Sequence, residues 1–345
     1  MSVPPAPALR PELLDVVPYG APQLDVPVRL NTNETPEAPP TAFLADLAAA
    51  IADLDLHRYP DREAVALRTA LAAREDLDVD RVWVANGSNE ILLQLLQAYA
   101  GPGRRAAGPA IGYSMYPELC RTTGTAFDVV DALEDAGDAD VLLLANPNNP
   151  TGALLGLDDL RRLHAVTRGL LVVDEAYVEF APEGSSARAL LDELPRLVVV
   201  RTFSKAFRLA GLRVGYLLGP AAVVDGLRRV RLPYHLDAVA QRAAVLALRH
   251  EPAFLAHRTR TISERDRVAS ALAALPGVVV HPSSANFLLF ETPVPDLFDR
   301  LLARGVLVRD VAATVGRPGA LRVTIGTPSE DDAFLAAVTA ALGGA

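Results

Sequence analysis

The chain has 345 residues, of which 50% are hydrophobic and 22% charged, the makeup of a globular protein long enough for about two domains. Disordered chains, collagens and repeat arrays are excluded by this composition. The net charge of −9 argues against a general nucleic-acid binder, because such proteins use basic patches to displace phosphate counterions. We therefore expect no nucleic-acid partner.

The single cysteine, Cys120, cannot form an internal disulfide or a Cys-type zinc site, which fits a reducing compartment. The first residues, MSVPPAPALRPELL, lack the basic and apolar regions of a secretory signal. No stretch approaches the ~18 apolar residues of a membrane span. These features predict a cytoplasmic protein with no membrane partner and no metal.

The basic residues are strongly skewed toward arginine. Of 33 basic side chains, Lys205 is the only lysine. Arginine stays protonated and cannot act as an amine nucleophile, whereas lysine can. The skew therefore predicts amine chemistry at Lys205.

The elements are taken in chain order. Residues 1–40 contain ten prolines, which predicts an extended arm instead of a packed helix. A helical pattern begins at Thr41, and short apolar runs then alternate with helical stretches, which is typical of an α/β protein with a mostly parallel sheet. The predicted strands are 81–85, 141–145, 170–173, 197–200 and 215–219.

The pattern from about 236 to 275 is helical and long enough to bridge two domains. The segment after it combines short strands with a helix near 296–304, which predicts a smaller α+β domain with the arm packed beside it. We expect a large domain over 41–240 and a smaller unit formed by 1–40 together with 241–345.

Polar motifs directly follow four of the predicted strands. In open α/β sheets the ligand lies beyond the carboxyl ends of the strands, so we expect the motifs to converge on one site. The motifs are NGSNE (86–90), NPNNPTG (146–152), DEAY (174–177) and RTFSK (201–205).

NGSNE lies between a strand and an apolar helix, so the backbone N–H groups of the first helical turn can bind phosphate. The alternative is an ordinary helix cap by Ser88 or Asn89, which is the commoner occurrence for such a motif taken alone.

Asp174 ends an apolar strand, so its carboxylate needs a cationic or hydrogen-bonded partner. A protonated pyridine nitrogen would supply one, and Tyr177 could reach the hydroxyl of the same ring. The alternative is an aspartate that caps the next helix.

NPNNPTG is compatible with a simple tight turn, since Asn, Pro and Gly are common turn residues. Its functional interpretation is that the Asn149 amide donates to a ring oxygen. We predict a cis Asn149–Pro150 bond, although only ~5–6% of such bonds are cis.

Lys205 follows the fourth of these strands, and a buried amine with a lowered pKa can form a Schiff base with a carbonyl. Ser204 and Arg213 suit a phosphate group. Taken together, the four motifs describe a pocket for a phosphorylated pyridine aldehyde, which is pyridoxal phosphate.

These residues closely resemble the fold-type I pyridoxal-phosphate enzymes and, within them, the histidinol-phosphate aminotransferase family. The resemblance implies a large domain with a mostly parallel sheet flanked by helices, a smaller α+β domain and an N-terminal arm. Further matching segments are LNTNETP (30–36), RYPD (58–61), YSMY (113–116), VDEAYVEF (173–180), RTFSKAFRLAGLRVGY (201–216), RLPYHL (231–236), SANFLLF (284–290), LVRD (307–310) and LRVTIGTP (321–328).

The resemblance also implies roles by position. Lys205 would hold the cofactor and act as general acid/base. Asp174 would pair with the ring nitrogen, Asn149 and Tyr177 with the ring hydroxyl, and Tyr113 would stack on the ring. The phosphate would be bound by backbone groups of Ser88 and Asn89 and by the side chains of Ser204 and Arg213.

In the family, the tyrosine of RYP, here Tyr59, reaches across from the partner of a homodimer. Tyr19, Arg309 and Arg322 fall where the family binds the substrate's phosphate or carboxylate. The alternatives for these three residues are a core aromatic side chain and surface ion pairs.

The chain departs from the family pattern at three places. Asn89 replaces a common aspartate, which is harmless if only backbone N–H groups serve. Arg208 replaces a small residue and either adds charge at the cofactor edge or points to solvent. PYHLD (233–237) replaces an Asn-containing version, which leaves Tyr234 and His235 as possible imidazole contacts.

The implied activity is transamination between L-glutamate and imidazole acetol phosphate, giving L-histidinol phosphate and 2-oxoglutarate in histidine biosynthesis. The alternatives are an aromatic amino-acid aminotransferase or, within the same fold, a threonine-phosphate decarboxylase. A regulator without catalysis would need a DNA-binding module, for which neither the charge nor the remaining length is suited.

Overall fold

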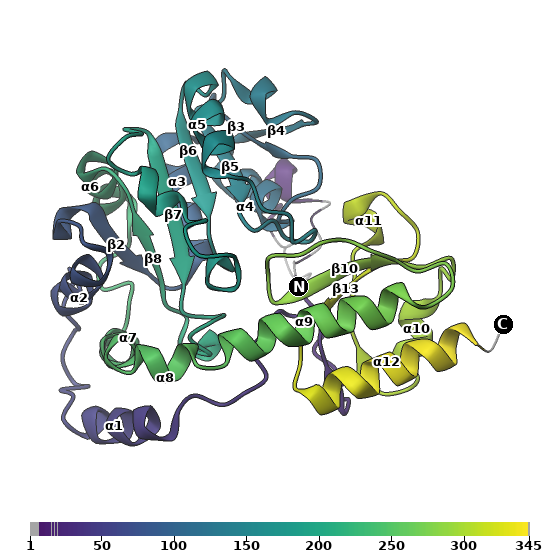
Figure 1. Cartoon of the computed structure of the whole chain (residues 1–345). Coiled ribbons are helices and arrows are strands. Elements are labelled where there is room, and N and C mark those ends of the chain that lie inside the picture. Colours follow the sequence, from purple (N-terminus) through teal and green to yellow (C-terminus); the bar gives the residue numbers. More distant parts are fainter. Residues whose placement is uncertain (1–6, 15, 17, 19, 344–345) are drawn as a thin grey trace, which may run out of the picture.

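The structure is a computed structural model that describes residues 7–14, 16, 18 and 20–343. In this part of the chain, seven strands form a central sheet in the order β2-β8-β7-β6-β5-β3-β4 (Figure 1). Its neighbouring strands are parallel except on either side of β8, which is antiparallel to both β2 and β7. The bounds are β2 (Val82–Ala85), β3 (Arg105–Pro109), β4 (Ala126–Val130), β5 (Val141–Ala145), β6 (Leu170–Asp174), β7 (Leu197–Thr202) and β8 (Gly215–Leu218).

The five strands expected from the sequence are confirmed to within two residues at each end, and two further strands were missed. β3 has the sequence RAAGP, whose small residues have low strand propensity. β4 lies at the sheet edge and carries Asp128 at its centre. Neither strand contains a long apolar run, because neither is buried along its whole length.

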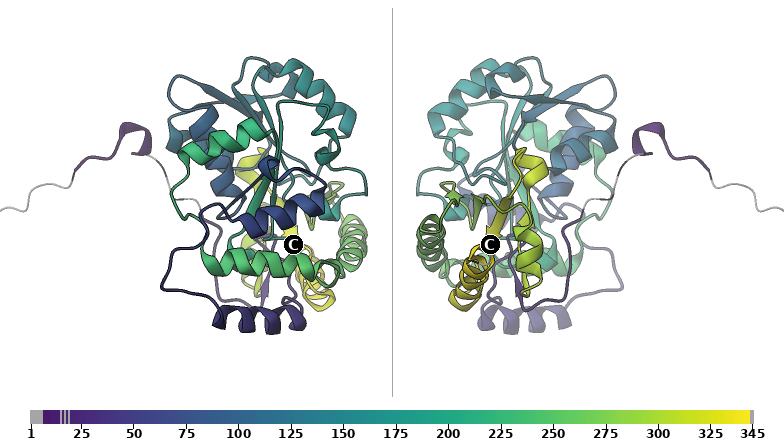
Figure 2. Two further views of the ribbon diagram at one scale, coloured as in Figure 1. Left: turned by 90° about the vertical axis from the view of Figure 1, so that its left-hand side faces the viewer. Right: turned by 90° about the vertical axis from the view of Figure 1, so that its right-hand side faces the viewer.

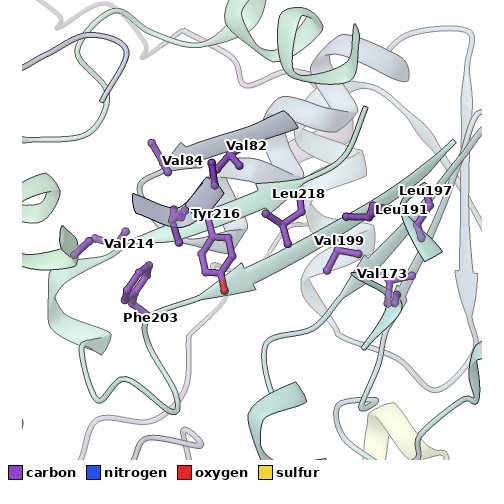
Figure 3. Close-up of a cluster of buried hydrophobic side chains, with 14 of the residues drawn as sticks. Val82, Val84, Val173, Leu191, Leu197, Val199, Phe203, Val214, Tyr216 and Leu218 are labelled. Carbon is purple, nitrogen blue, oxygen red and sulfur yellow. The ribbon is translucent and has the colours of Figure 1, made fainter. Parts of the chain in front are cut away.

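Both faces of the sheet are covered by helices (Figure 2). Along β7, Leu197 and Val199 belong to one buried cluster, and Val198 and Val200 to the other. A strand buried on both faces needs an uninterrupted apolar run, which explains why LVVV was easy to recognise. Figure 3 shows part of the first cluster.

The helices divide between the two faces. Those that contribute to the first cluster are α1 (Thr41–Ala52), α2 (Val65–Glu75), α5 (Leu157–Val166), α7 (Ala238–Arg249) and, through Phe254, α8 (Glu251–Leu255). Those on the second face are α3 (Ser88–Tyr99), α4 (Met115–Thr123) and α6 (Ala221–Val230). The 3-10 helices are η1 (Pro11–Leu13), η2 (Val79–Arg81), η3 (Leu133–Ala136), η4 (Val178–Phe180), η5 (Ala187–Leu190) and η6 (Ala210–Leu212).

The C-terminal part holds a second, smaller sheet. Its described strands follow the antiparallel order β12-β13-β10-β9. The bounds are β9 (Val279–Val280), β10 (Phe287–Glu291), β12 (Arg309–Asp310) and β13 (Ala320–Thr324). Helices α9 (Arg258–Ala273) and α12 (Pro328–Leu342) lie side by side against it (Figure 1), and α10 (Leu297–Leu302) and α11 (Ala312–Val315) complete this part.

The arm packs beside this smaller sheet, as expected. Strand β1 (Val28–Arg29) pairs in parallel with β11 (Val306–Leu307). Val28 and Leu30 belong to the same apolar cluster as α9 and α12. The arm therefore leads residues 31–34 from the smaller sheet toward the ends of the large one.

The long helical pattern predicted over 236–275 is broken into three helices. α7 ends at Arg249, α8 spans Glu251–Leu255, and α9 begins at Arg258. Pro252 lies in the first turn of α8, where its missing N–H is tolerated, and it cannot continue α7. None of the described helices combines the length and apolar character needed to cross a membrane.

Candidate active site

The carboxyl ends of β2, β5, β6 and β7 open onto one cavity of about 360 Å3. The motifs after these four strands thus meet, as the sequence predicted. The predicted site residues that line the cavity are Ser88, Asn89, Tyr113, Asn149, Asp174, Tyr177, Ser204, Lys205, Arg213, Arg309 and Arg322. Tyr59 does not line it, and Tyr19 lies outside the described residues.

Helix α3 presents its N-terminus to the cavity. Gly87 is the residue before the helix, with a φ of 87°, and no side chain caps the first turn. The interpretation of Ser88 or Asn89 as a capping residue is therefore wrong. The Asn89 side chain instead accepts a hydrogen bond from the Tyr113 hydroxyl at 3.3 Å.

The loop before α3 approaches β8 closely. A Cβ atom at Gly215 would lie 2.5 Å from both the Gly87 carbonyl carbon and the Ser88 nitrogen, so only glycine fits there. A Cβ atom at Gly87 would lie 2.7 Å from the Arg213 guanidinium. These glycines allow the helix end and Arg213 to meet around one small volume.

Ser204 and Arg213 complete this corner of the cavity. The Arg213 guanidinium donates to the Ser204 Oγ at 3.3 Å, and the Thr202 hydroxyl lies 2.9 Å from the same oxygen. A helix N-terminus, a hydroxyl and a guanidinium all stabilise an anion, so the corner has the chemistry of a phosphate site.

Asp174 ends β6 on the cavity wall and is only 4% exposed. Burial raises the pKa of its carboxyl group to about 7, although Oδ1 accepts a hydrogen bond from the Ala176 N–H at 3.2 Å. No regular α-helix follows directly, since the next element is the short η4, so the helix-capping alternative is wrong. A buried carboxylate of this kind is suited to a cationic partner in the cavity.

Lys205 Nζ donates to the Thr32 carbonyl at 2.9 Å. The pKa of Lys205 falls to about 8, chiefly because the amine is buried and next because the Arg322 guanidinium lies nearby. A larger neutral fraction near neutral pH makes this amine a better nucleophile than an ordinary lysine.

Asn149, Tyr177 and Arg322 form a hydrogen-bonded chain across the cavity. Arg322 Nη1 donates to Asn149 Oδ1 at 2.6 Å, and Asn149 Nδ2 donates to the Tyr177 hydroxyl at 3.4 Å. The predicted cis Asn149–Pro150 bond is confirmed, and Asn146–Pro147 is also cis.

Sequence reasoning missed several cavity residues. Asn31, Thr32, Asn33, Glu34 and Thr202 line it as well. The first four belong to LNTNETP, which matches the family pattern without implying a role for any one of them. A polar run in an extended segment shows no hydrophobic periodicity. Only the hydrogen-bonding side chains of these residues could have marked them as site candidates.

Tyr59 lies on the surface, where it is 80% exposed and stacks on Tyr234 with ring centres 4.4 Å apart. His235 stacks on Trp83, and its Nε2 lies 3.0 Å from the Val84 carbonyl oxygen. Neither Tyr234 nor His235 lines the cavity of this chain. The proposed imidazole contacts are therefore not made within one chain.

Both alternatives for Arg208 are wrong. Its side chain is 9% exposed, donates to the Ala38 and Phe254 carbonyls and pairs with Glu37 at 3.4 Å. It therefore fastens the arm to α8 and does not line the cavity.

The cavity fits pyridoxal phosphate on its own chemistry. It offers an anion site between Gly87 and Arg213, a buried acid at Asp174 and an amine at Lys205. These groups match the three reactive ends of the cofactor: phosphate, ring nitrogen and aldehyde.

Residues 26–338 match the family described as aminotransferase class I and II. The histidinol-phosphate aminotransferase of Mycolicibacterium smegmatis is 51% identical, covering 95% of this chain and 92% of its own length. That of Mycobacterium marinum is 48% identical, covering 95% and 91%.

Among solved structures, the histidinol-phosphate aminotransferase from Sinorhizobium meliloti, in complex with pyridoxal-5'-phosphate, has a TM-score of 0.84 at 25% identity, covering 92% of this chain and 91% of that chain. L-threonine-O-3-phosphate decarboxylase from Porphyromonas gingivalis has a TM-score of 0.82 at 26% identity, covering 92% and 99%. The relatives near 50% identity decide between these two, and the chain belongs to the histidinol-phosphate aminotransferase family, within the class I and II aminotransferases.

Proposed function

We propose that the protein transfers the amino group between L-glutamate and imidazole acetol phosphate, giving L-histidinol phosphate and 2-oxoglutarate. The observation that carries this proposal is that one cavity contains the sole lysine, a buried acid and three arginines. Two relatives of the chain, at 48% and 51% identity, are named histidinol-phosphate aminotransferases, and the matches cover 91% and 92% of their length.

Pyridoxal phosphate is the cofactor that the cavity residues would hold. Ser88, Asn89, Ser204 and Arg213 would bind its phosphate, and Asp174 would bind its ring nitrogen. Tyr113 would pack on the ring, and Asn149 with Tyr177 would bind the ring oxygen. When bound, the cofactor supplies an aldehyde that condenses with amines and a ring that withdraws electrons from the substrate.

Lys205 is proposed as the general base. With its pKa near 8, a substantial fraction of the Nζ amine is neutral at neutral to mildly alkaline pH, and that amine can take a proton from the substrate α-carbon. Asp174 would place a negative charge at the ring nitrogen, which would keep the ring an electron acceptor. The Lys205 amine donates to the carbonyl of Thr32, and both residues line the cavity.

Arg309 and Arg322 are proposed to bind the anionic end of each substrate in turn. Glutamate ends in a carboxylate and imidazole acetol phosphate in a phosphate, and a guanidinium binds either anion through two hydrogen bonds. Arg322 is held by the Asn31 carbonyl at 2.8 Å and by Asn149, so its position does not depend on the substrate.

We also propose a homodimer in which Tyr59 completes the partner's site. The support is the exposed Tyr59–Tyr234 stack, together with Leu56 and Leu232, which are close to these tyrosines in the sequence and are 64% and 73% exposed. Exposed aromatic and aliphatic side chains of this kind are typical of a protein interface.

The domain division stays a proposal: residues 41–240 form the large unit, and helix α7, which begins at its end, packs on it. A cytoplasmic location is proposed because the lone thiol, Cys120, is free and buried.

A panel of amino donors tests the proposed function. The purified holoenzyme is assayed with histidinol phosphate, phenylalanine and threonine phosphate, each with 2-oxoglutarate as acceptor. We expect kcat/KM to be highest for histidinol phosphate. A preference for phenylalanine would indicate an aromatic aminotransferase, and release of CO2 from threonine phosphate would indicate a decarboxylase.

A further inference from the structure

Asn33 is hydrogen-bonded to Tyr177 and has no role among the residues assigned above. It is 1% exposed and has a left-handed backbone with a φ of 54°, a conformation that asparagine adopts more readily than most residues. Its N–H donates to the Thr324 Oγ1 at 2.9 Å, and its carbonyl accepts from Asn286 Nδ2 at 3.2 Å. The residue is thus held on both sides by the smaller sheet.

The direction of each hydrogen bond around Asn33 follows from these contacts. Thr324 Oγ1 accepts from the Asn33 N–H, and its own proton is then directed to Asn33 Oδ1, 3.2 Å away. Because Asn33 Oδ1 accepts from Thr324, the other end of the amide, Nδ2, faces Tyr177. It donates to the Tyr177 hydroxyl oxygen at 3.0 Å.

The same argument fixes Asn149 on the other side of Tyr177. A guanidinium can only donate, so the 2.6 Å contact from Arg322 identifies the Asn149 atom as oxygen. Asn149 Nδ2 therefore also donates to the Tyr177 hydroxyl, at 3.4 Å. The phenol oxygen receives two N–H donors.

A phenol oxygen has two lone pairs and one proton. Both amides donate to this oxygen, so its lone pairs are occupied and its proton is left to donate, and Tyr177 lines the cavity. We propose that Asn33 is a positioning residue that orients the Tyr177 hydroxyl as a hydrogen-bond donor into the cavity. The inference rests on the proposed function, because the acceptor it implies is the oxygen of the cofactor ring.

The test measures the bound cofactor's visible absorbance against pH in the purified holoenzyme. A donor stabilises the anionic ring oxygen, so losing it makes the chromophore hold its proton more tightly and raises the midpoint pH. Asn33→Asp replaces the donor by an acceptor that can capture the Tyr177 proton. Asn33→Gly removes the side chain without straining the left-handed backbone.

A double-mutant cycle with Tyr177→Phe separates orientation from charge. The charged groups that face this hydroxyl are Lys205, Asp174 and, through Asn149, Arg322, with Tyr116 as a further titratable group. All of them are present in each arm of the cycle. The direct effect of a new carboxylate at position 33 is retained in the Tyr177→Phe background, whereas an effect that acts through the hydroxyl is lost.

We expect Asn33→Asp to raise the midpoint by about one unit more in the native background than in the Tyr177→Phe background, the size of one hydrogen bond to an anionic group. Asn33→Gly should raise it by less, again only where Tyr177 is present. Equal shifts in the two backgrounds would overturn the proposal.

Glu37→Gln is the matched control on the same arm. Glu37 pairs with Arg208 and Arg260 and does not touch Tyr177, so this variant should leave the midpoint unchanged. If it shifts the midpoint as Asn33→Asp does, general loosening of the arm is the cause and the proposal fails. If Tyr177→Phe alone leaves the midpoint unchanged, the assigned role of Tyr177 in the proposed function fails instead.

Discussion

Arg309 and Arg322 lie directly opposite each other on the antiparallel strands β12 and β13, and both line the cavity. Opposed residues on such strands project to the same side of the sheet, and two like charges in this arrangement cost about 0.2–1 kcal/mol. An anion bound between the two guanidinium groups would offset this cost, since they would share a negative partner. The pair marks the end of the cavity at which the anionic end of a substrate would lie.

Replacing Arg322 should impair both half-reactions. Arg322→Ala removes charge-assisted hydrogen bonds worth about 1.5–3 kcal/mol each, so we expect kcat/KM to fall by about ten- to hundredfold or more for glutamate and for histidinol phosphate. Stopped-flow absorbance of each half-reaction measures the effect. Arg309→Ala is the comparison, and its effect should be smaller because Arg309 is less buried. Unchanged kinetics with glutamate would exclude the dual role of Arg322.

Gly215 should tolerate no side chain. Gly215→Ala places a Cβ 2.5 Å from the backbone of Gly87 and Ser88, so the N-terminus of α3 must move away from the phosphate corner. We expect a clear loss of affinity for pyridoxal phosphate, measured by fluorescence titration of the cofactor-free protein. Gly219→Ala, directly after the same strand, is the control, because its Cβ would meet its nearest neighbours at 3.4–3.6 Å. Equal affinities in the two variants would contradict this account.

Much of the cavity was predictable because its residues follow strands that are easy to recognise. β5, β6 and β7 are buried on both faces and are apolar up to their carboxyl ends, so the polar residues that end or follow them stand out. The lone lysine marks one of these strand ends as reactive on composition alone. The strand ends then fix where Asp174, Asn149 and Ser204 lie relative to Lys205.

The contribution of the arm could not be predicted in the same way. Asn33 reaches Tyr177 only because β1 pairs with β11 and because Thr324 and Asn286 hold its backbone. These contacts join residues more than 140 positions apart, and nothing in the local sequence encodes them. Arg208 shows the same limit, since its interpretation required the position of α8 and of Glu37.

Replacing the sole lysine should abolish transamination without unfolding the protein. Lys205→Arg conserves the charge, but a guanidinium can neither form a Schiff base nor act as a base near neutral pH. We expect activity to fall by several orders of magnitude while the circular dichroism spectrum is unchanged. Borohydride reduction should fix the cofactor to the native protein but not to the variant. Covalent labelling of Lys205→Arg would show that another group carries the aldehyde.

The capture of pyridoxal phosphate by the cofactor-free protein should depend on pH with a midpoint near 8. Only the neutral amine reacts, and the pKa of Lys205 is about 8. Arg322 helps to lower this pKa, so Arg322→Gln should move the midpoint to higher pH. Glu34 opposes the lowering, so Glu34→Gln should move it to lower pH. Stopped-flow absorbance gives the rates, and shifts of the same sign in both variants would contradict the electrostatic explanation.

Asp174 should lower the stability of the cofactor-free protein in a pH-dependent way. Its pKa is about 7 in the folded protein and near 3.8 in the unfolded chain. Below about pH 4 the carboxyl group is protonated in both states and has no effect on stability. Between pH 4 and 7 the unfolded chain releases the proton and the folded protein retains it, so stability falls as the pH rises, by at most about 4 kcal/mol above pH 7.

Asp174→Asn should therefore stabilise the cofactor-free protein at pH 8 but not at pH 4, and it should weaken cofactor binding. Asp331 is the matched control outside the cavity, because it is fully buried, has a pKa of about 7 and accepts from the Gly326 N–H at 2.8 Å. Asp331→Asn should stabilise the protein at pH 8 with unchanged cofactor affinity. Urea unfolding and cofactor titration distinguish the two variants. If Asp174→Asn binds pyridoxal phosphate as tightly as Asp331→Asn does, the carboxylate of Asp174 is not the partner of the ring nitrogen.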